Sequence, residues 1–206
     1  MYHLIFDFDG VIGDTLTASA EATAAIEGID VLSARAANAR YARTKPNHVR
    51  DHTLSGAQMS GLLSWTSAFG ERMRASAFPL FEDFVREIES IDTPHKAVVS
   101  SGSQKYVVPS LARTNIRPTH ILAFEDHHSK EEKIESICLD WQVAVTDVFY
   151  FTDTLADVYE LSGMLAKERL IGVSWGYCTS EELAQVLEER YILKTPKDIH
   201  NVLAYA

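Results

Sequence analysis

The sequence predicts an α/β protein, with a doubly wound parallel sheet and a small all-helical insert after the first strand. Three observations indicate this fold class. Short apolar, β-rich runs alternate with helix-like stretches along most of the 206 residues. The runs are almost continuously apolar, which is typical of parallel strands covered by helices on both faces. Residues 16–77 break the alternation, because only helical spacing is found there.

The elements of the sheet follow one another in a regular order along the chain. Strands are expected at residues 3–8, 96–100, 119–124, 148–152 and 170–174. The stretches between them read as helices, which would cover the two faces of the sheet. Pro109 lies where the helix after the second strand should run, and we expect a break or a restart of the helix there.

The insert leads us to expect two unequal domains, since the chain is too short for two full domains of typical size. The expected domains are an α/β core, residues 1–15 and 78–206, and a helical domain, residues 16–77. Within the insert, Trp65, Phe69 and Met73 follow helical spacing. This spacing favours a core of the insert's own over a substrate-binding face.

Composition and charge exclude several classes of protein. The net charge of −10 argues against nucleic acid as a partner, because a nucleic-acid-binding protein needs a basic face. No run approaches the roughly 18 apolar residues of a membrane span. The first residues lack the basic flank and apolar run of a signal peptide, so we expect a cytoplasmic protein. Cys138 and Cys178 lack metal-ligand spacing and indicate no disulfide framework.

Two carboxylates lie at the end of the first expected strand. Asp7 and Asp9 alternate with Phe8, so their side chains point to the same side, and Gly10 ends the strand with a turn. Ligands of open α/β sheets bind at the carboxyl ends of the strands. Two carboxylates directed together repel each other unless a cation lies between them, and Mg²⁺ prefers carboxylate, phosphate and water oxygens. The pair therefore predicts a magnesium site at this edge of the sheet.

The motif around these acids resembles a known family. The run from Asp7 to Val11, followed by Asp14 and Thr15, is similar to the first motif of the haloacid dehalogenase-like superfamily, whose members are mostly phosphatases. The residues that match the other three motifs follow in the right order: Ser100, Ser101 and Gly102; Lys130; Asp153 and Asp157. The resemblance covers nearly the whole chain. It implies the branch of phosphoglycolate phosphatases and beta-phosphoglucomutases, in which the helical insert is a small cap.

The resemblance implies a role for each acid. Asp7 would attack phosphorus and form an aspartyl-phosphate, and Asp9 would act first as general acid and then as general base. Mg²⁺ would be held by the Asp7 side chain, the Asp9 main-chain carbonyl and Asp153. Asp157, one helical turn further on, would reach the same metal directly or through water.

The resemblance also implies that Ser100 and Lys130 grip the phosphoryl group. Ser100 would do so with main-chain N–H groups near Ser101 and Gly102. The Ser-Lys-Glu-Glu run that contains Lys130 reads as a capping box, so Lys130 lies in the first helical turn, where the helix dipole disfavours a cation. Its position therefore indicates a second role. Lys133, a turn later, is the rival candidate, and its simpler interpretation is a solvated surface lysine.

The cap would close over the site and contribute specificity. Arg43 and Arg50 are our candidates for contacts with the non-phosphate part of the substrate. Together these residues predict a Mg²⁺-dependent phosphatase that acts on a small phosphorylated metabolite, as a monomer or a homodimer. A sugar-phosphate mutase similar to beta-phosphoglucomutase and a binding or regulatory protein with this fold are the alternatives. A dehalogenase is disfavoured, because Asp9 and the metal-binding acids would have no role in it.

Overall fold

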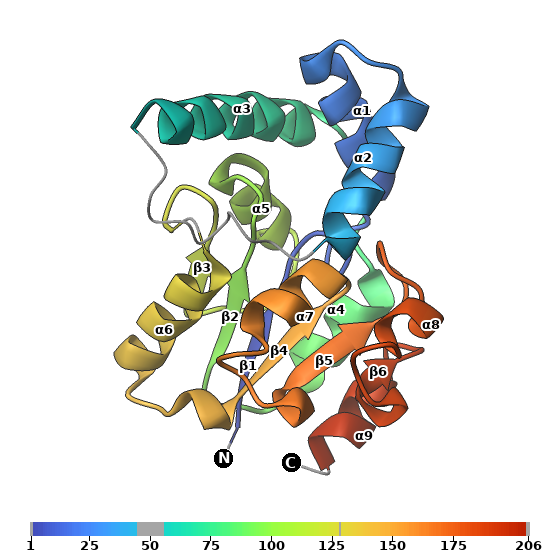
Figure 1. The fold of residues 1–206 in the computed structure, drawn as a ribbon. Coiled ribbons are helices and arrows are strands. Elements are labelled where there is room, and N and C mark those ends of the chain that lie inside the picture. The colour runs from blue at the N-terminus through green and yellow to red at the C-terminus, as the bar shows by residue number, and fades with distance from the viewer. Residues whose placement is uncertain (1, 45–55, 128, 205–206) are drawn as a thin grey trace.

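One parallel sheet organises the chain. The computed structural model describes residues 2–44, 56–127 and 129–204. In this part of the chain six parallel strands form the sheet, in the order β3-β2-β1-β4-β5-β6 (Figure 1). The strands are β1 His3–Phe6, β2 Lys96–Val99, β3 His120–Leu122, β4 Val148–Thr152, β5 Leu170–Val173 and β6 Ile192–Leu193. The order runs outward from β1 to one side and from β4 to the other, so the topological switch point lies between these two strands.

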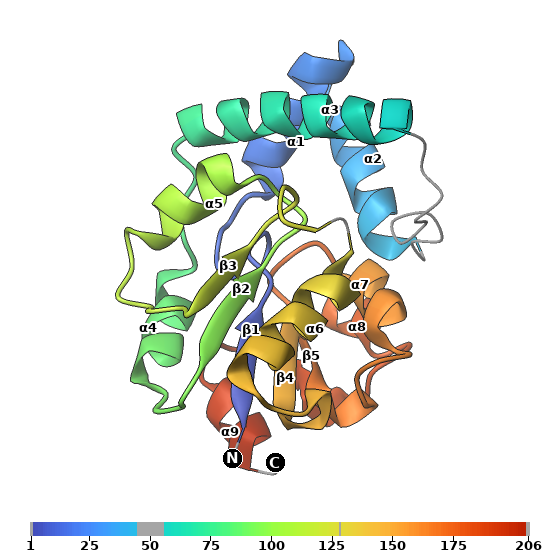
Figure 2. The ribbon, with the colours of Figure 1, turned by 90° about the vertical axis from the view of Figure 1, so that its left-hand side faces the viewer.

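Helices cover both faces of the sheet (Figure 2). They are α4 Glu82–Ser90, α5 Gln104–Leu111, α6 Lys130–Trp141, α7 Leu155–Leu161, α8 Ser180–Leu183 and α9 Asp198–Ala204, with 3-10 turns at Val145–Asp147, Lys167–Arg169 and Glu189–Tyr191. Phe6 of β1 is buried in one cluster with α4, α5 and α9, and Ile5 in another with α6, α7 and α8. Alternate residues of β1 thus serve opposite faces. The predicted doubly wound α/β sheet is confirmed.

Two details of the sheet region differ from the expectation. Strand β6 was not predicted, because its two residues are too few to give a periodic signal. Helix α5 runs through Pro109 without a break or restart, so that prediction was wrong. Pro109 lies on the exposed side of a short helix, where water can satisfy the carbonyl group of Lys105 that loses its helical partner.

Between β1 and α4, the residues that the structure describes form three helices. They are α1 Leu16–Glu27, α2 Val31–Arg43 and α3 Gly56–Ala75. Figure 1 shows them above the edge of the sheet at which the strands end. Helix α2 contacts α7 and helix α3 contacts α5, so the segment touches helices from both faces of the sheet. Helix α3 is the longest in the described ranges, and none of these helices is long and apolar enough to cross a membrane. The division of the chain into two domains stays a prediction.

Met73 does not belong to a separate core of the insert. It is fully buried in the same cluster as Phe6 of β1 and Phe84 of α4, so the prediction was wrong for this residue. The reason is that the last turn of α3 reaches down to the helices that cover the sheet. Phe69, one turn earlier, is partly buried against the same cluster.

Candidate active site

Polar residues gather where three neighbouring strands end. Asp7 follows β1, Ser100 follows β2 and Asp153 follows β4. Because these strands are parallel neighbours at the centre of the sheet, their carboxyl ends lie side by side. Predicted site residues from distant parts of the chain therefore meet at one edge, next to the topological switch point.

Lys130 places a cation at this edge. It is buried at the start of α6, where Ser129 caps the helix by accepting from the N–H of Glu132. Its Nζ donates to Asp7 Oδ2 and to Asp157 Oδ2, both at 2.6 Å. Burial would lower the pKa of Lys130, but the two carboxylates hold it above its ordinary value. Lys130 therefore stays protonated and links Asp7 to Asp157.

The structure distinguishes Lys130 from Lys133. Lys133 is fully buried, and its Nζ donates to the main-chain carbonyl of Ser100 at 2.6 Å. Its interpretation as a solvated surface lysine was therefore wrong. Burial lowers the pKa of Lys133 to about 7. Of the two lysines it is Lys130 that contacts Asp7, while Lys133 holds the end of β2.

Asp157 directs one oxygen into a cluster of donors. Its Oδ2 accepts from Lys130, from Thr152 Oγ1 at 2.7 Å and from the Tyr150 hydroxyl at 3.1 Å. Burial would raise the pKa of Asp157, but Lys130 and Thr152 hold it below its ordinary value. This arrangement makes Asp157 a partner of Lys130. Its contact with a metal stays a prediction.

Asp153 is enclosed by main chain. It is fully buried, and its Oδ2 accepts from the N–H of Tyr177 at 2.7 Å. A Cβ atom added at Gly10 or Gly176 would lie 2.0 or 2.2 Å from that oxygen, so only glycine leaves room for the carboxylate. Burial raises the pKa of Asp153 to about 7. Its Oδ1 has no hydrogen-bond partner among the described residues.

Asp9 is held by a tyrosine that the sequence did not point to. The Tyr106 hydroxyl donates to Asp9 Oδ2 at 2.6 Å, and Ser100 Oγ lies 3.3 Å from the same oxygen. A Cβ atom at Gly102 would lie 1.8 Å from the Tyr106 hydroxyl, so the glycine lets the tyrosine reach Asp9. Burial raises the pKa of Asp9, although the Tyr106 hydrogen bond acts against this shift.

The loop after β2 has its own hydrogen bonds. Ser100 Oγ accepts from the N–H of Gly102 at 2.8 Å, so this N–H is already engaged within the loop. Ser101 is exposed and lines the cavity above the site. Ser101 is thus the loop residue whose side chain is open to a ligand, while Ser100 contacts Asp9.

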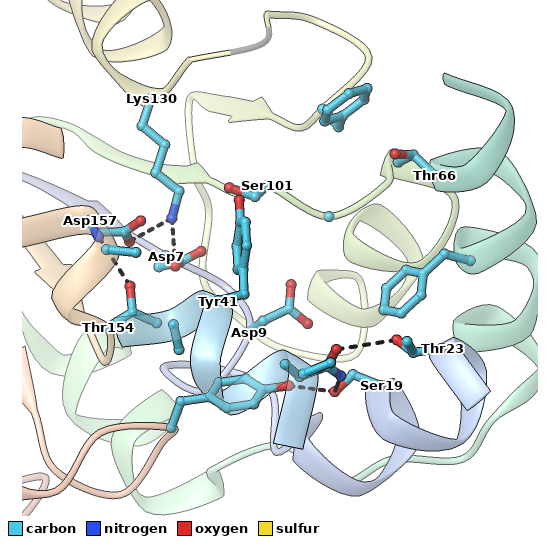
Figure 3. A pocket seen from close by; sticks show the side chains of 18 of the residues that line it. Asp7, Asp9, Ser19, Thr23, Tyr41, Thr66, Ser101, Lys130, Thr154 and Asp157 are labelled. Atoms are coloured by element: carbon cyan, nitrogen blue, oxygen red, sulfur yellow. Dashed lines mark hydrogen bonds and ion pairs between the residues drawn. The ribbon is translucent and has the colours of Figure 1, made fainter. Parts of the chain in front are cut away.

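A cavity of about 450 Å³ lies above these residues (Figure 3). Asp7, Asp9 and Lys130 belong to its floor, and helices α1, α2 and α3 contribute its walls. Trp65 and Phe69 of α3 line it with stacked rings, whose centroids are 5.1 Å apart. The expectation that these two residues form a core of the insert was therefore wrong. Helical spacing alone does not distinguish a face that meets a core from one that meets a cavity.

Arg43 has a different partner from the one expected. Its guanidinium forms two hydrogen bonds with Glu182 of α8, at 2.6 and 2.8 Å, and donates to the Tyr177 carbonyl at 2.8 Å. Arg43 is not among the residues that line the cavity, and its contact with the substrate stays a prediction. Arg50 lies outside the described residues.

The residues at the edge of the sheet fit a divalent cation. Within the described ranges, no three His, Cys, Asp or Glu side chains converge into a metal centre by themselves. Mg²⁺, however, takes only one or two carboxylates from a protein and completes its shell with water or phosphate oxygens. Asp153 keeps a buried oxygen, Oδ1, that lacks a donor in the described part of the chain. A cation beside it would satisfy this oxygen.

Solved structures share this fold. A scan of protein-family models and a search of curated proteins found no match. A hydrolase from Pseudomonas syringae matches with a TM-score of 0.71 at 15% identity, over 100% of this chain and 99% of that chain. A predicted phosphoglycolate phosphatase from Haemophilus somnus matches with a TM-score of 0.66 at 17% identity, over 98% of each chain. An L-2-haloacid dehalogenase matches with a TM-score of 0.63 at 15% identity, over 100% of each chain.

Proposed function

We propose that this chain, whose fold is that of the haloacid dehalogenase-like hydrolases, is a Mg²⁺-dependent phosphatase that acts on a small phosphorylated metabolite. One observation carries the proposal. Asp7 lies at the floor of a cavity, 2.6 Å from the buried ammonium group of Lys130, with a second carboxylate, Asp9, two residues further along the chain. Phosphoryl transfer to a carboxylate requires a nucleophile, a counter-charge and a proton donor, and these three residues can supply them.

In the first step, a carboxylate oxygen of Asp7 attacks phosphorus and the bond between phosphorus and the leaving oxygen breaks. Asp9 gives its proton to that oxygen, so the product alcohol leaves neutral and Asp7 carries the phosphoryl group. The raised pKa of Asp9 suits it to hold this proton. Tyr106 and Ser100 fix the orientation of the Asp9 carboxyl group through their contacts with Oδ2.

In the second step, water attacks phosphorus and the bond from phosphorus to Asp7 breaks. Asp9, now a carboxylate, takes a proton from the water, so inorganic phosphate leaves and both acids return to their starting states. Lys130 opposes the negative charge on Asp7 and on the phosphoryl oxygens throughout. Asp157 keeps Lys130 charged and directed at Asp7, which makes it a positioning residue.

Mg²⁺ would be held by the carboxylates of Asp7 and Asp153 and by the main-chain carbonyl of Asp9. When bound, it supplies positive charge that lets an anionic phosphate approach the Asp7 carboxylate. The unpartnered Oδ1 of Asp153 and the excess of carboxylate over ammonium groups support this assignment.

The decisive measurement is phosphate release from an aryl phosphate in the presence of Mg²⁺. We expect Asp7→Asn to abolish turnover, since an amide does not act as the nucleophile, while Asp83→Asn, an exposed acid outside the cavity lining, keeps it. Unchanged activity in Asp7→Asn would contradict the nucleophile assignment.

The same assay separates the competing chemistries. Transfer of the phosphoryl group back to a sugar phosphate, without phosphate release, would identify a mutase. Halide release from a 2-haloacid would identify a dehalogenase. No turnover with any phosphorylated metabolite would favour a binding protein.

A further inference from the structure

We propose that the substrate of this site is a phosphomonoester whose leaving group is an uncharged ring system bearing hydroxyl or amide groups. The cavity above the site would disfavour a leaving group with a negative charge of its own. This inference rests on the proposed phosphatase function and adds to it a class of substrate. It is argued from the two kinds of wall that surround the cavity and from the charges at its floor.

One wall is aromatic. Trp65 and Phe69, one helical turn apart on α3, present rings that are nearly parallel, with an interplanar angle of 13°. The indole N–H of Trp65 donates to Glu27 of α1, which fixes the orientation of this ring. Figure 3 shows the Tyr41 side chain directed from α2 into the same cavity. Such a wall favours a planar or apolar ring, because aromatic rings stack and exclude water.

Another part of the lining is polar but uncharged. Ser19 of α1 shares a hydrogen bond with the Tyr177 hydroxyl, and the amide of Asn38 in α2 donates to Ser19 Oγ at 3.4 Å. Thr23 donates to the Asn38 carbonyl oxygen at 3.4 Å, and Figure 3 draws this network at Ser19 and Thr23. The Asn38 amide and the hydroxyls of Thr23 and Tyr177 can donate to or accept from a neutral polar substituent.

Charge in the cavity lining is confined to the floor. Within the described ranges, the charged lining residues are Asp7, Asp9, Asp157, Glu160 and Lys130. The ammonium group among them already contacts two carboxylates. A second anion on the substrate would therefore lose its water among neutral side chains, close to the substrate's own phosphate and the carboxylates of the floor. The volume of about 450 Å³ suits a phosphate and a ring, since small-molecule sites span this range.

The test compares substrates that differ in one property. 4-Carbamoylbenzyl phosphate and 4-carboxybenzyl phosphate have the same size and shape, but only the second carries a charge on its leaving group. With Mg²⁺ present, we expect kcat/KM to be at least about tenfold higher for the amide. We also expect benzyl phosphate to exceed ethyl phosphate by about tenfold, because ethanol lacks a ring to stack. Equal values within either pair would overturn the inference.

A charge added at the cavity should change this preference. Leu62 lines the cavity and is 37% exposed, whereas its neighbour Leu63 is 42% exposed and does not line it. Leu62→Arg should raise kcat/KM for the carboxylate relative to the amide by about tenfold, since it adds a cation to the cavity lining. Leu63→Arg, with the same added charge outside the cavity, should leave the ratio as in the unaltered protein. An equal shift in both variants would show that the cavity does not set the preference.

A binding measurement with compounds that are not hydrolysed distinguishes failure of this inference from failure of the proposed function. The phosphonate analogues of the amide and carboxylate compounds are not hydrolysed, and their affinities can be measured by calorimetry with Mg²⁺ present. Tighter binding of the amide supports the inference whether or not turnover is seen. Turnover of aryl phosphates with equal affinity for the two phosphonates would retain the phosphatase and reject the substrate class.

Discussion

Asp153 combines complete burial with an oxygen that lacks a donor in the described residues. Its pKa, raised by burial to about 7, means that the metal-free folded protein holds a proton there at pH values where the unfolded chain does not. By proton linkage, this contribution to stability is full below about pH 4 and is lost as the pH rises toward 7. A bound cation would replace the proton at neutral pH.

The metal-free protein should therefore lose stability relative to Asp153→Asn as the pH rises from about 5 to about 7.5. Asparagine can still accept from the Tyr177 N–H but never becomes charged, so the change in the stability difference between the two proteins measures loss of the Asp153 proton. Over this pH range we expect a change of about 2–3 kcal/mol. Thermal unfolding in a chelator at several pH values measures it. Added Mg²⁺ should raise the Tm of the unaltered protein more at pH 7.5 than at pH 5.5. A difference between the two proteins that does not vary with pH would contradict the assignment.

The sequence could predict which acids meet, but not all their neighbours. Asp7, Ser100 and Asp153 each follow an apolar run, so strand order alone brings them together. Tyr106 and Lys133 could not be assigned in this way, because their contacts depend on how α5 and α6 pack against the ends of the strands. From sequence alone, a lysine in a helix is expected to be exposed, because the packing of the helix is not known.

At the scale of elements, the contact between α3 and α5 decides where the aromatic wall of the cavity lies. A Cβ atom at Gly70 of α3 would lie 2.5 Å from Ser103 Oγ and 2.6 Å from Ser103 Cβ. Ser103 is the N-cap of α5, and its side chain accepts from the N–H of Lys105. The two helices therefore meet at a position where no side chain fits.

Gly70→Ala should push α3 away from α5 and destabilise the protein by about 1–3 kcal/mol, because neither Ser103 nor the helix backbone can move freely. It should also raise KM, since Trp65 and Phe69 are on the same helix. Gly61→Ala is the matched control. Gly61 lies in α3 with open space around it, so alanine there should stabilise the helix by about 0.5–1 kcal/mol. Denaturant unfolding of both variants checks the pair, and a loss of stability in Gly61→Ala would contradict this account.

A helix or strand could be predicted where its pattern of apolar residues is strong. The five longer strands are near-continuous apolar runs, whereas β6 has two residues and depends on its pairing with β5. The break predicted at Pro109 is not found, because the packing of the short helix α5 outweighs the low helix propensity of proline. The insert was predicted as helical, but which of its residues face the cavity follows only from its position over the sheet.

At the scale of the whole molecule, two ion pairs among the described residues connect the helical insert to the rest of the chain. Arg43 of α2 pairs with Glu182 of α8 through both carboxylate oxygens. Lys105 of α5 pairs with Glu71 of α3 at 2.8 Å. Both pairs are partly exposed, so each contributes little to global stability. Their position suggests a different effect, on how firmly α2 and α3 stay over the cavity.

Glu182→Gln should raise KM severalfold and change the Tm only slightly. Glutamine can still accept the hydrogen bond from the Thr179 N–H at the start of α8, so the variant removes the charge and one of the two hydrogen bonds with Arg43. The KM of the unaltered protein should rise with NaCl concentration, and that of the variant should rise less. Glu188→Gln, whose partner Arg190 is close in sequence and outside the insert, serves as the control. An identical salt dependence in the unaltered protein and Glu182→Gln would argue against this role.

Gly102 limits which substitutions the sequence can accept. It has no side chain, yet any larger residue there would collide with the hydroxyl of Tyr106. In a library that contains every substitution at each position and is selected for turnover, position 102 should accept as few substitutions as position 7. The amount of folded protein would distinguish the two positions. A substitution at Asp7 leaves a folded but inactive protein, whereas a substitution at Gly102 disturbs the packing of α5.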